Sequence, residues 1–339
     1  AHPAQGHGQL VLRAGPPGLS GGWRWTNHPD HKKTSITETM TTNRNWNRYH
    51  LHSNGQEEPA LPNPGDARGQ APLMKPQGQT RKEALRPIIL SSRAATRVGT
   101  WNVRTMLEAG RAQTIAKEMK AYKLEVLGVS ETHWTQSGET HIQSGETIIF
   151  SGHQEENAVH SEGVGFFLSK AARHALIEWE PVSLRIITAK FRTKVNRINL
   201  VMLQCYAPTN EAEDEDKLAF YDQLQAKLRK IKKRDVLLVM SDFNAKVGDD
   251  NTGYETVMGK QGVGTMNENG EMLVDFCMSN ELVIGGTVFP HKVMHKTTWV
   301  SPDHITENQI DHVCINRKFR HTLLDTRTKR GADAASDHH

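Results

Sequence analysis

Short apolar segments alternate with segments of helical periodicity from residue 97 to the carboxyl terminus. Residues 124–129 and 235–240 predict buried strands, because each is a brief, mainly apolar run between polar residues. Such alternation restricts the chain to a fold in which sheets pack against helices. The helix predicted before the second strand has one apolar face, which consists of Leu218, Tyr221, Leu224, Leu228 and Ile231.

The order of these segments predicts two sheets. Four strand-like segments follow one another without a helical pattern between them, as in antiparallel hairpins, and elsewhere strands alternate with helices. We therefore expect one α/β domain over residues 97–339, built as two packed sheets covered by helices. The four consecutive strands are expected at 147–150, 163–168, 184–191 and 198–206, other strands at 97–101, 282–284, 297–300 and 310–315, and other helices at 112–122 and 271–279.

The first 96 residues have a different composition. Gly, Pro, Asn, His and Thr dominate them, and no period of 2 or 3.6 is sustained. Such a segment cannot bury enough apolar surface to offset its ordering entropy, so we expect residues 1–96 to be disordered or of low complexity. They hold 12 Lys/Arg and 6 Asp/Glu, against 30 and 32 in the remainder. The basic segment is either a tether to nucleic acid or a solvated linker or translated non-coding stretch.

The chain has a net charge of +4 and three cysteines, Cys205, Cys277 and Cys314. Because they are odd in number and fit no CxxC pattern, we expect a reducing compartment, nuclear or cytoplasmic, and no disulfide framework. Residues 236–240, the longest aliphatic run near any motif, are far shorter than the ~20 residues of a membrane span. The first thirty residues contain no signal-peptide core. We therefore expect a soluble protein with no membrane partner.

Polar residues stand directly after several of the predicted strands. Asn102, Glu131 and Tyr206 each follow one strand, and Asp242 and Asn244 follow another. In open α/β sheets the ligand site lies at the carboxyl ends of strands, so these side chains are candidates for chemistry. The alternative is that each one is a turn former or a helix N-cap.

The carboxyl-terminal third adds a second polar group. Asp311 and His312 lie in a predicted strand, and Asp337 and His338 lie near the end of the chain. Carboxylates and amides are hard-oxygen ligands for Mg²⁺, and histidine is a general base. Together with the strand-end residues they suit cleavage of a phosphate ester by an activated water molecule.

Seven short motifs occur in order along the chain: WNVR from Trp101, SETHW from Ser130, QCYAPT from Gln204, SDFNAKVG from Ser241, TTW from Thr297, NQIDHV from Asn308 and SDHH from Ser336. In this order they resemble the motif series of the endonuclease/exonuclease/phosphatase superfamily. Within it, the chain is most similar to the apurinic-endonuclease-like domain of RTE-type non-LTR retrotransposons. The resemblance covers residues 97–339 and implies a DNase I-like fold, a four-layer sandwich of two packed mixed sheets flanked by helices.

The resemblance also implies a metal site. Glu131 matches the principal Mg²⁺ ligand, and Asn102 and Asp337 match residues close to the metal, with Mn²⁺ as the alternative ion. Asp242 and Asn244 match residues that orient the attacking water and the developing phosphorane.

The remaining matched residues would act on the phosphate and the DNA. His338 matches the histidine at the scissile phosphate, and Asp311 the acid that fixes its tautomer. Tyr206 would give its hydroxyl to the phosphate. Thr298 and Trp299 match a segment beside the DNA backbone, although a tryptophan inside a strand is equally a core residue.

Three departures from the family pattern stand out. Arg104 occupies a position where apurinic endonucleases carry an acid, and Ser241 replaces a glycine. The family also continues for one more strand after the histidine, whereas this sequence ends at His339. We therefore expect a domain truncated before its last strand, with weak activity or none.

These observations predict a Mg²⁺-dependent endonuclease that nicks a DNA strand by water attack. The alternatives are a domesticated, non-catalytic nuclear or chromatin interaction protein and a phosphatase of the same superfamily. The expected partner is DNA, and the protein is expected to be a monomer. A reverse transcriptase domain is expected only where the chain is part of a longer polyprotein.

Overall fold

The computed structural model describes residues 5–12, 95–155, 160–332 and 336–338. The chain divides into two units, Ala1–Pro17 with Leu85–His339, and Gly18–Ala84. The second unit lies outside the described residues, as does most of the segment expected to be disordered. No helix in the described part of the chain is long and apolar enough to cross a membrane.

The first unit contains a seven-stranded and a six-stranded mixed sheet. The first has the order β15-β1-β2-β3-β6-β5-β4, and the second has the order β11-β14-β10-β9-β8-β7. A separate two-stranded ribbon pairs β12, Trp299–Val300, with β13, Glu307–Asn308. The sheet strands are β1 Gln5–Leu12, β2 Thr96–Asn102, β3 Val126–Ser130, β4 Ser137–His141, β5 Thr147–Ser151, β6 Val164–Leu168, β7 Leu176–Ser183, β8 Ile186–Arg192, β9 Asn199–Tyr206, β10 Val236–Asp242, β11 Leu282–Ile284, β14 Asp311–Asn316 and β15 Leu323–Ala332.

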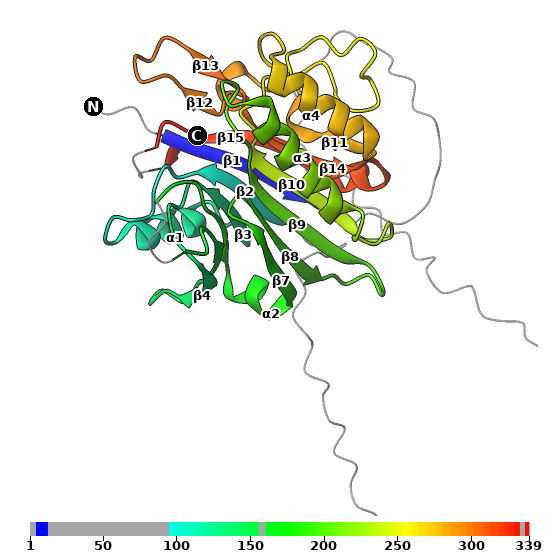
Figure 1. The fold of residues 1–339 in the computed structure, drawn as a ribbon. Helices are drawn as coiled ribbons and strands as arrows, with labels where there is room; N and C mark the ends of the chain where they lie inside the picture. The colour runs from blue at the N-terminus through cyan, green and yellow to red at the C-terminus, as the bar shows by residue number, and fades with distance from the viewer. Residues whose placement is uncertain (1–4, 13–94, 156–159, 333–335, 339) are drawn as a thin grey trace, which may run out of the picture. The chain divides into compact units, whose positions relative to one another are not determined.

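Helices cover the outer faces of the two sheets. Figure 1 shows α1 on the side of β2 and β3, and α3 and α4 on the side of β10 and β11. The architecture has four layers, and the fold class predicted from the sequence is confirmed. The helices are α1 Arg111–Ala121, α2 Lys170–Ala175, α3 Asp214–Leu228 and α4 Glu268–Ser279, with 3₁₀ turns at Gly285–Thr287, Val293–His295 and Arg317–Thr322.

The central strands are apolar on both faces because both faces are covered. In β10, Leu238 and Met240 pack in the core between the sheets, whereas Leu237 and Val239 pack beneath α3 and α4. This alternation explains why an unbroken apolar run in the sequence marks a strand rather than a loop. All three cysteines are buried and free.

The two sheets approach each other closely at Gly128 of β3. A Cβ atom there would lie 1.9 Å from Gln204 Oε1 of β9, so only glycine leaves room for this glutamine. The buried Gln204 Oε1 accepts a hydrogen bond from Thr100 Oγ1 of β2 at 3.1 Å. This contact ties together the strands whose ends carry the polar residues.

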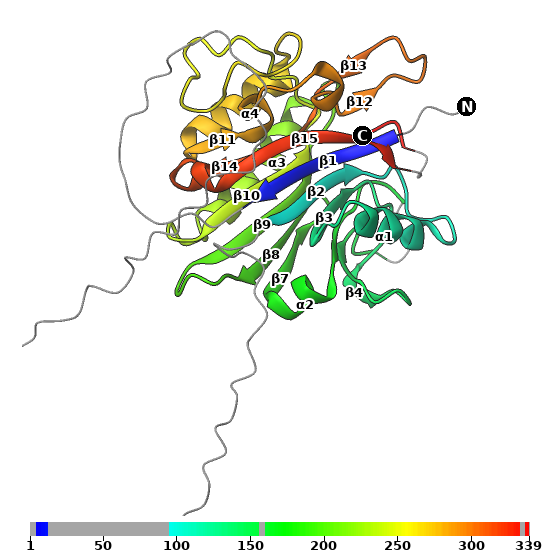
Figure 2. The same ribbon diagram turned by 180° about the vertical axis from the view of Figure 1, so that it is seen from behind.

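One strand lies within the segment expected to be disordered. Gln5–Leu12 forms β1, which pairs antiparallel with β15 on one side and with β2 on the other. Figure 2 shows β1, in blue, between β15 and β2. The expectation that no core element precedes residue 97 therefore does not hold for these eight residues. Their short Leu-Val-Leu run is too brief to give a periodic signal in the sequence.

Candidate active site

The carboxyl ends of two pairs of parallel strands meet at one end of the packed sheets. β2 runs parallel to β3, and β9 runs parallel to β10. Asn102 ends β2, Tyr206 ends β9, Asp242 ends β10, and Glu131 directly follows β3. The Asn102 side-chain nitrogen donates to Glu131 Oε1 at 2.7 Å and to Asp242 Oδ2 at 2.9 Å. One amide therefore joins the ends of both sheets.

Asn102 turns its nitrogen, not its oxygen, toward these carboxylates. Its Oδ1 accepts a hydrogen bond from the backbone N–H of Arg104 at 2.9 Å. Asn102, which is expected to lie close to the metal, is thus placed as a donor to two candidate ligands.

Glu131 lies in a strained backbone conformation beside Tyr206. Its φ of 54° is in the left-handed region, a cost that folded proteins tolerate mainly at functional sites. The Tyr206 hydroxyl hydrogen-bonds with the Glu131 carboxylate. Burial, followed by the charge of Glu131, raises the pKa of Tyr206 well above its usual value. This hydroxyl therefore keeps its proton and acts as a donor.

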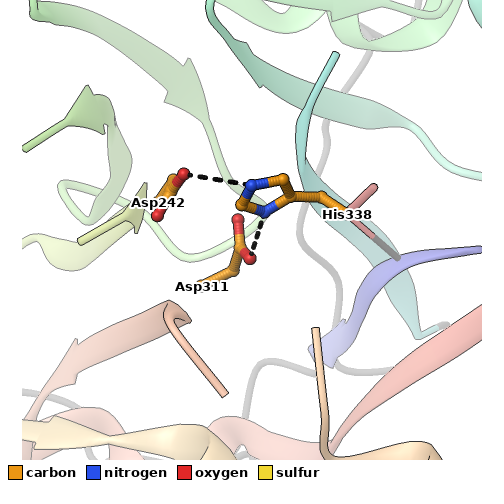
Figure 3. Close-up of side chains that lie close together, drawn as sticks. All are labelled: Asp242, Asp311 and His338. Atoms are coloured by element: carbon orange, nitrogen blue, oxygen red, sulfur yellow. Dashed lines mark hydrogen bonds and ion pairs between the residues drawn. The ribbon is translucent and has the colours of Figure 1, made fainter. Parts of the chain in front are cut away.

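His338 lies between two buried carboxylates (Figure 3). Its Nδ1 is 2.9 Å from Asp311 Oδ2, and its Nε2 is 3.6 Å from Asp242 Oδ2. Burial alone would lower the pKa of His338, but the charges of Asp311 and Asp242 outweigh it and raise the pKa to about 10. Burial, with the nearby charge of Asp311, raises the pKa of Asp242. The protonation of Asp242 and that of His338 therefore depend on each other.

Asp337 is fixed by the β12–β13 ribbon. Trp299 Nε1 donates to Asp337 Oδ2 at 3.1 Å, and the backbone N–H of Val300 donates to the Asp337 carbonyl. The other oxygen, Asp337 Oδ1, is buried and has no hydrogen-bond partner. Arg104 Nε lies 3.6 Å from it, as an ion pair. Trp299 is half-buried and lines the cleft, so it is not a core residue.

Thr298 lies behind the cleft rather than in it. The side chain is buried, and its hydroxyl accepts hydrogen bonds from the backbone N–H groups of Ile310 and Asp311, each at 3.0 Å. The structure therefore does not place Thr298 beside a substrate, where the resemblance put it. It anchors the start of β14, and with it the Asp311 carboxylate.

Asn244 lies in a tight loop after β10. Its φ is 51°, its backbone N–H donates to Asp242 Oδ1 at 3.0 Å, and its side-chain nitrogen donates to the Ala207 carbonyl. The buried His312 donates from Nε2 to the Ala245 carbonyl at 2.7 Å, which holds this loop against β14. The sequence placed His312 near the site but did not show this role.

Most of the predicted site residues line a cleft of about 410 Å³. Of the predicted site residues, all but the buried Asn102, Thr298 and Asp311 line it. The cleft has further lining residues that were not among the predicted site residues, although Thr209, Lys246, Asn308 and Ile310 lie within the quoted motifs. The added residues are Thr209, Asn210, Glu211, Lys246, Asn267, Asn308 and Ile310, together with Arg104, which the sequence marked only as a departure.

The donor set of the cleft fits a divalent metal ion. Glu131 and Asp337 offer carboxylate oxygens, and Asp337 Oδ1 is a buried oxygen without a hydrogen bond, which a cation would satisfy. A second group, Asp242, Asp311 and His338, has ligand atoms within 4.8 Å of one another. Both groups adjoin the same cleft. The first is all oxygen, the donor type that Mg²⁺ prefers.

Comparison with solved structures agrees with the observed fold. The catalytic domain of APE2 from Xenopus laevis superimposes with a TM-score of 0.50 at 16% sequence identity, over 71% of this chain and 88% of that one. No family model matches the chain. Two packed mixed sheets with a polar cleft at their strand ends give the chain the DNase I-like fold that the sequence predicts.

In sequence, the chain is similar to proteins named craniofacial development protein 2. The protein of that name from Bos taurus is 36% identical over 241 residues, 71% of this chain and 39% of its own length. The one from Tragulus javanicus is 35% identical over 241 residues, 71% of this chain and 40% of its own length. The chain thus spans about two fifths of these relatives.

Proposed function

We propose that this protein is a Mg²⁺-dependent phosphodiesterase, a retrotransposon-derived endonuclease that nicks one strand of DNA by water attack. One observation carries the proposal: a buried histidine held between two carboxylates opens onto a cleft that also presents the unsatisfied oxygen of Asp337. That combination supplies proton transfer and metal binding within one site. The motif order of the retrotransposon domain supports DNA as the substrate.

In this proposal Glu131 and Asp337 would hold a divalent metal ion, whose charge would offset that of the scissile phosphate. Asp242 Oδ2 and His338 Nε2, 3.6 Å apart, face the reacting atoms from one side. The oxygen of a water molecule attacks phosphorus, the bond from phosphorus to the 3′ oxygen breaks, and the Asp242 carboxylate takes the water proton, because the raised pKa of His338 keeps its imidazole protonated. The leaving oxygen takes a proton from solvent water and becomes a 3′ hydroxyl, which could prime reverse transcription in a longer polyprotein.

The other side chains position these groups. Asp311 holds His338 through Nδ1, so that Nε2 points at the reaction. Tyr206, whose raised pKa keeps it protonated, would turn its hydroxyl from Glu131 to a phosphate oxygen when the substrate binds. Asn244 orients the attacking water from the same cleft wall. Trp299 fixes Asp337 and borders the path of the DNA backbone.

A plasmid assay tests the proposal. Supercoiled plasmid is incubated with the purified chain in Mg²⁺ and in EDTA, and a phosphate monoester is offered in parallel. We expect nicked circles in Mg²⁺, intact plasmid in EDTA and no turnover of the monoester. Monoester hydrolysis with intact plasmid would instead support a phosphatase, and inactivity in both assays would support a non-catalytic interaction protein.

A further inference from the structure

Arg104 is a cation on the cleft wall beside a candidate metal ligand. It follows β2 in a left-handed conformation, with a φ of 59°. Its backbone N–H is held by Asn102 Oδ1 at 2.9 Å, and the preceding residue, Val103, is buried and donates its N–H to the Ser130 carbonyl. Both anchors belong to the ends of β2 and β3. The fixed turn therefore directs the Arg104 side chain into the cleft.

The Arg104 guanidinium lies close to Asp337 but makes no hydrogen bond with it. The Nε to Oδ1 distance of 3.6 Å is too long for a hydrogen bond, and 58% of the Arg104 side chain is exposed. Arginine has five N–H donors in a planar fork that matches a phosphate. Exposure leaves these donors free to reach a ligand in the cleft.

The other charged residues that line the cleft indicate which ligand the Arg104 side chain binds. Glu131, Glu211, Asp242 and Asp337 make its wall acidic, which repels a phosphodiester. Arg104 and Lys246 are the arginine and lysine side chains among its lining residues. Of these two, arginine binds a phosphate through two parallel hydrogen bonds, whereas lysine acts as a point charge.

We infer that Arg104 exchanges partners during substrate binding: its guanidinium neutralises Asp337 in the free protein and binds a DNA phosphate in the complex. In the free state the arginine competes with a divalent cation for Asp337 Oδ1. When DNA takes the guanidinium, that oxygen is released to the metal. This exchange deepens the proposed function, on which it rests for the identity of the phosphodiester.

The exchange predicts opposite changes in two affinities when Arg104 is removed. Arg104→Met keeps the length of the side chain and removes its charge, so Asp337 is more available to a cation. The same change removes a phosphate contact. We expect Mg²⁺ to bind the DNA-free variant ~3 to 10-fold more tightly, and DNA to bind ~10-fold more weakly in EDTA.

The test uses the full chain and two binding measurements that require no catalysis. Calorimetry gives the Mg²⁺ dissociation constant without DNA, and fluorescence anisotropy gives the affinity for a duplex oligonucleotide in EDTA over a range of salt. Arg104→Lys keeps the charge but loses the fork, so its Mg²⁺ affinity should stay near wild type while DNA binding falls. The salt dependence of DNA binding should lose about one phosphate contact in Arg104→Met.

Arg197→Met is the matched control. Arg197 is exposed and has a φ of 63°, but it lies in the turn between β8 and β9, at the end of β9 opposite Tyr206. We expect neither affinity to change. If Arg104→Met weakens both the Mg²⁺ affinity and the DNA affinity, or changes neither, the proposed exchange is wrong. If Mg²⁺ binds more tightly while the DNA affinity is unchanged, Arg104 does not bind a DNA phosphate. A wild-type chain that shows both affinities but never nicks would overturn the proposed function and leave the exchange standing.

Discussion

At the scale of residues, the site depends on charges that are buried together. Asp242, Asp311 and His338 all lie below one tenth exposure, so each interacts strongly with the others. Asn102 adds a neutral donor that holds Asp242 and Glu131 in place. The arrangement makes the protonation of His338 depend on its neighbours more than on solvent.

The first prediction concerns the pKa of His338. In Asp311→Asn the main charge that raises this pKa is lost, while burial, which lowers it, remains. We expect the pKa to fall by more than one unit from about 10. Histidine ring NMR over pH 5 to 11 checks this, with His338→Gln to assign the signal and Asp250→Asn, an exposed aspartate, as the matched control.

The same shift has a consequence for stability. Because folding raises the pKa of His338, the pairing stabilises the protein fully below the unfolded value of ~6.5 and is lost as the pH rises through about 10. The difference in unfolding free energy between the wild type and Asp311→Asn should therefore shrink over that range. A pKa of His338 that is unchanged in Asp311→Asn would contradict this description of the site.

Most of these residues could be predicted from the sequence, because the end of a buried strand is marked by an apolar run followed by a polar residue. Glu131, Tyr206 and Asp242 each follow an apolar run, and the carboxyl ends of parallel strands converge. It could not place Thr298 behind the cleft, since that depends on which face a side chain takes in a short ribbon. It also could not show the Arg104–Asp337 pair, which joins segments far apart in the chain.

At the scale of elements, the strands differ in how well the sequence marks them. β10 is buried on both faces, so its apolar run is continuous. β15 has few buried positions, among them Leu323 and Thr328, and its half-buried charged residues interrupt the apolar pattern that would mark a strand in the sequence. The helix α2 was not predicted from the sequence, because its six residues are too few to show a helical period.

We expect β1 to stabilise the seven-stranded sheet. It pairs with five residues of β2 and seven of β15, and deleting it leaves both strands with unpaired backbone groups. Disorder over residues 1–96, which the composition predicts, would make such a deletion nearly neutral. We now expect removal of residues 1–12 to lower the melting temperature by several degrees, because each lost backbone hydrogen bond costs ~1 kcal/mol.

The control for this deletion removes eight residues from the second unit, residues 60–67, and should leave the melting temperature unchanged. Calorimetry or circular dichroism follows both variants. β2 ends at Asn102 and β15 leads toward His338, so the larger deletion should also slow nicking. Equal melting temperatures for the wild type and the chain without residues 1–12 would show that β1 does not stabilise the sheet.

At the scale of the whole molecule, the cleft exists only where the two sheets meet. Asn102 and Glu131 come from the seven-stranded sheet and the segment that follows one of its strands, and Tyr206 and Asp242 come from the six-stranded sheet. The Thr100–Gln204 contact and the Asn102 amide hold these ends in register. The fold was predictable because each sheet has its own apolar pattern. The relative placement of the sheets was not, because it depends on close contacts such as that at Gly128.

In the proposed function this cleft hydrolyses DNA phosphodiesters. The most direct measurement is the plasmid-nicking rate in Mg²⁺ of the Glu131→Gln, Asp242→Asn double variant, compared with the wild type and with Asp250→Asn. Both changes remove charge that acts mainly on the transition state and keep the side-chain shapes. We predict a loss of at least ~10²-fold in the double variant, a wild-type rate in Asp250→Asn and unchanged circular dichroism in both. Nicking by the double variant at the wild-type rate would contradict the account.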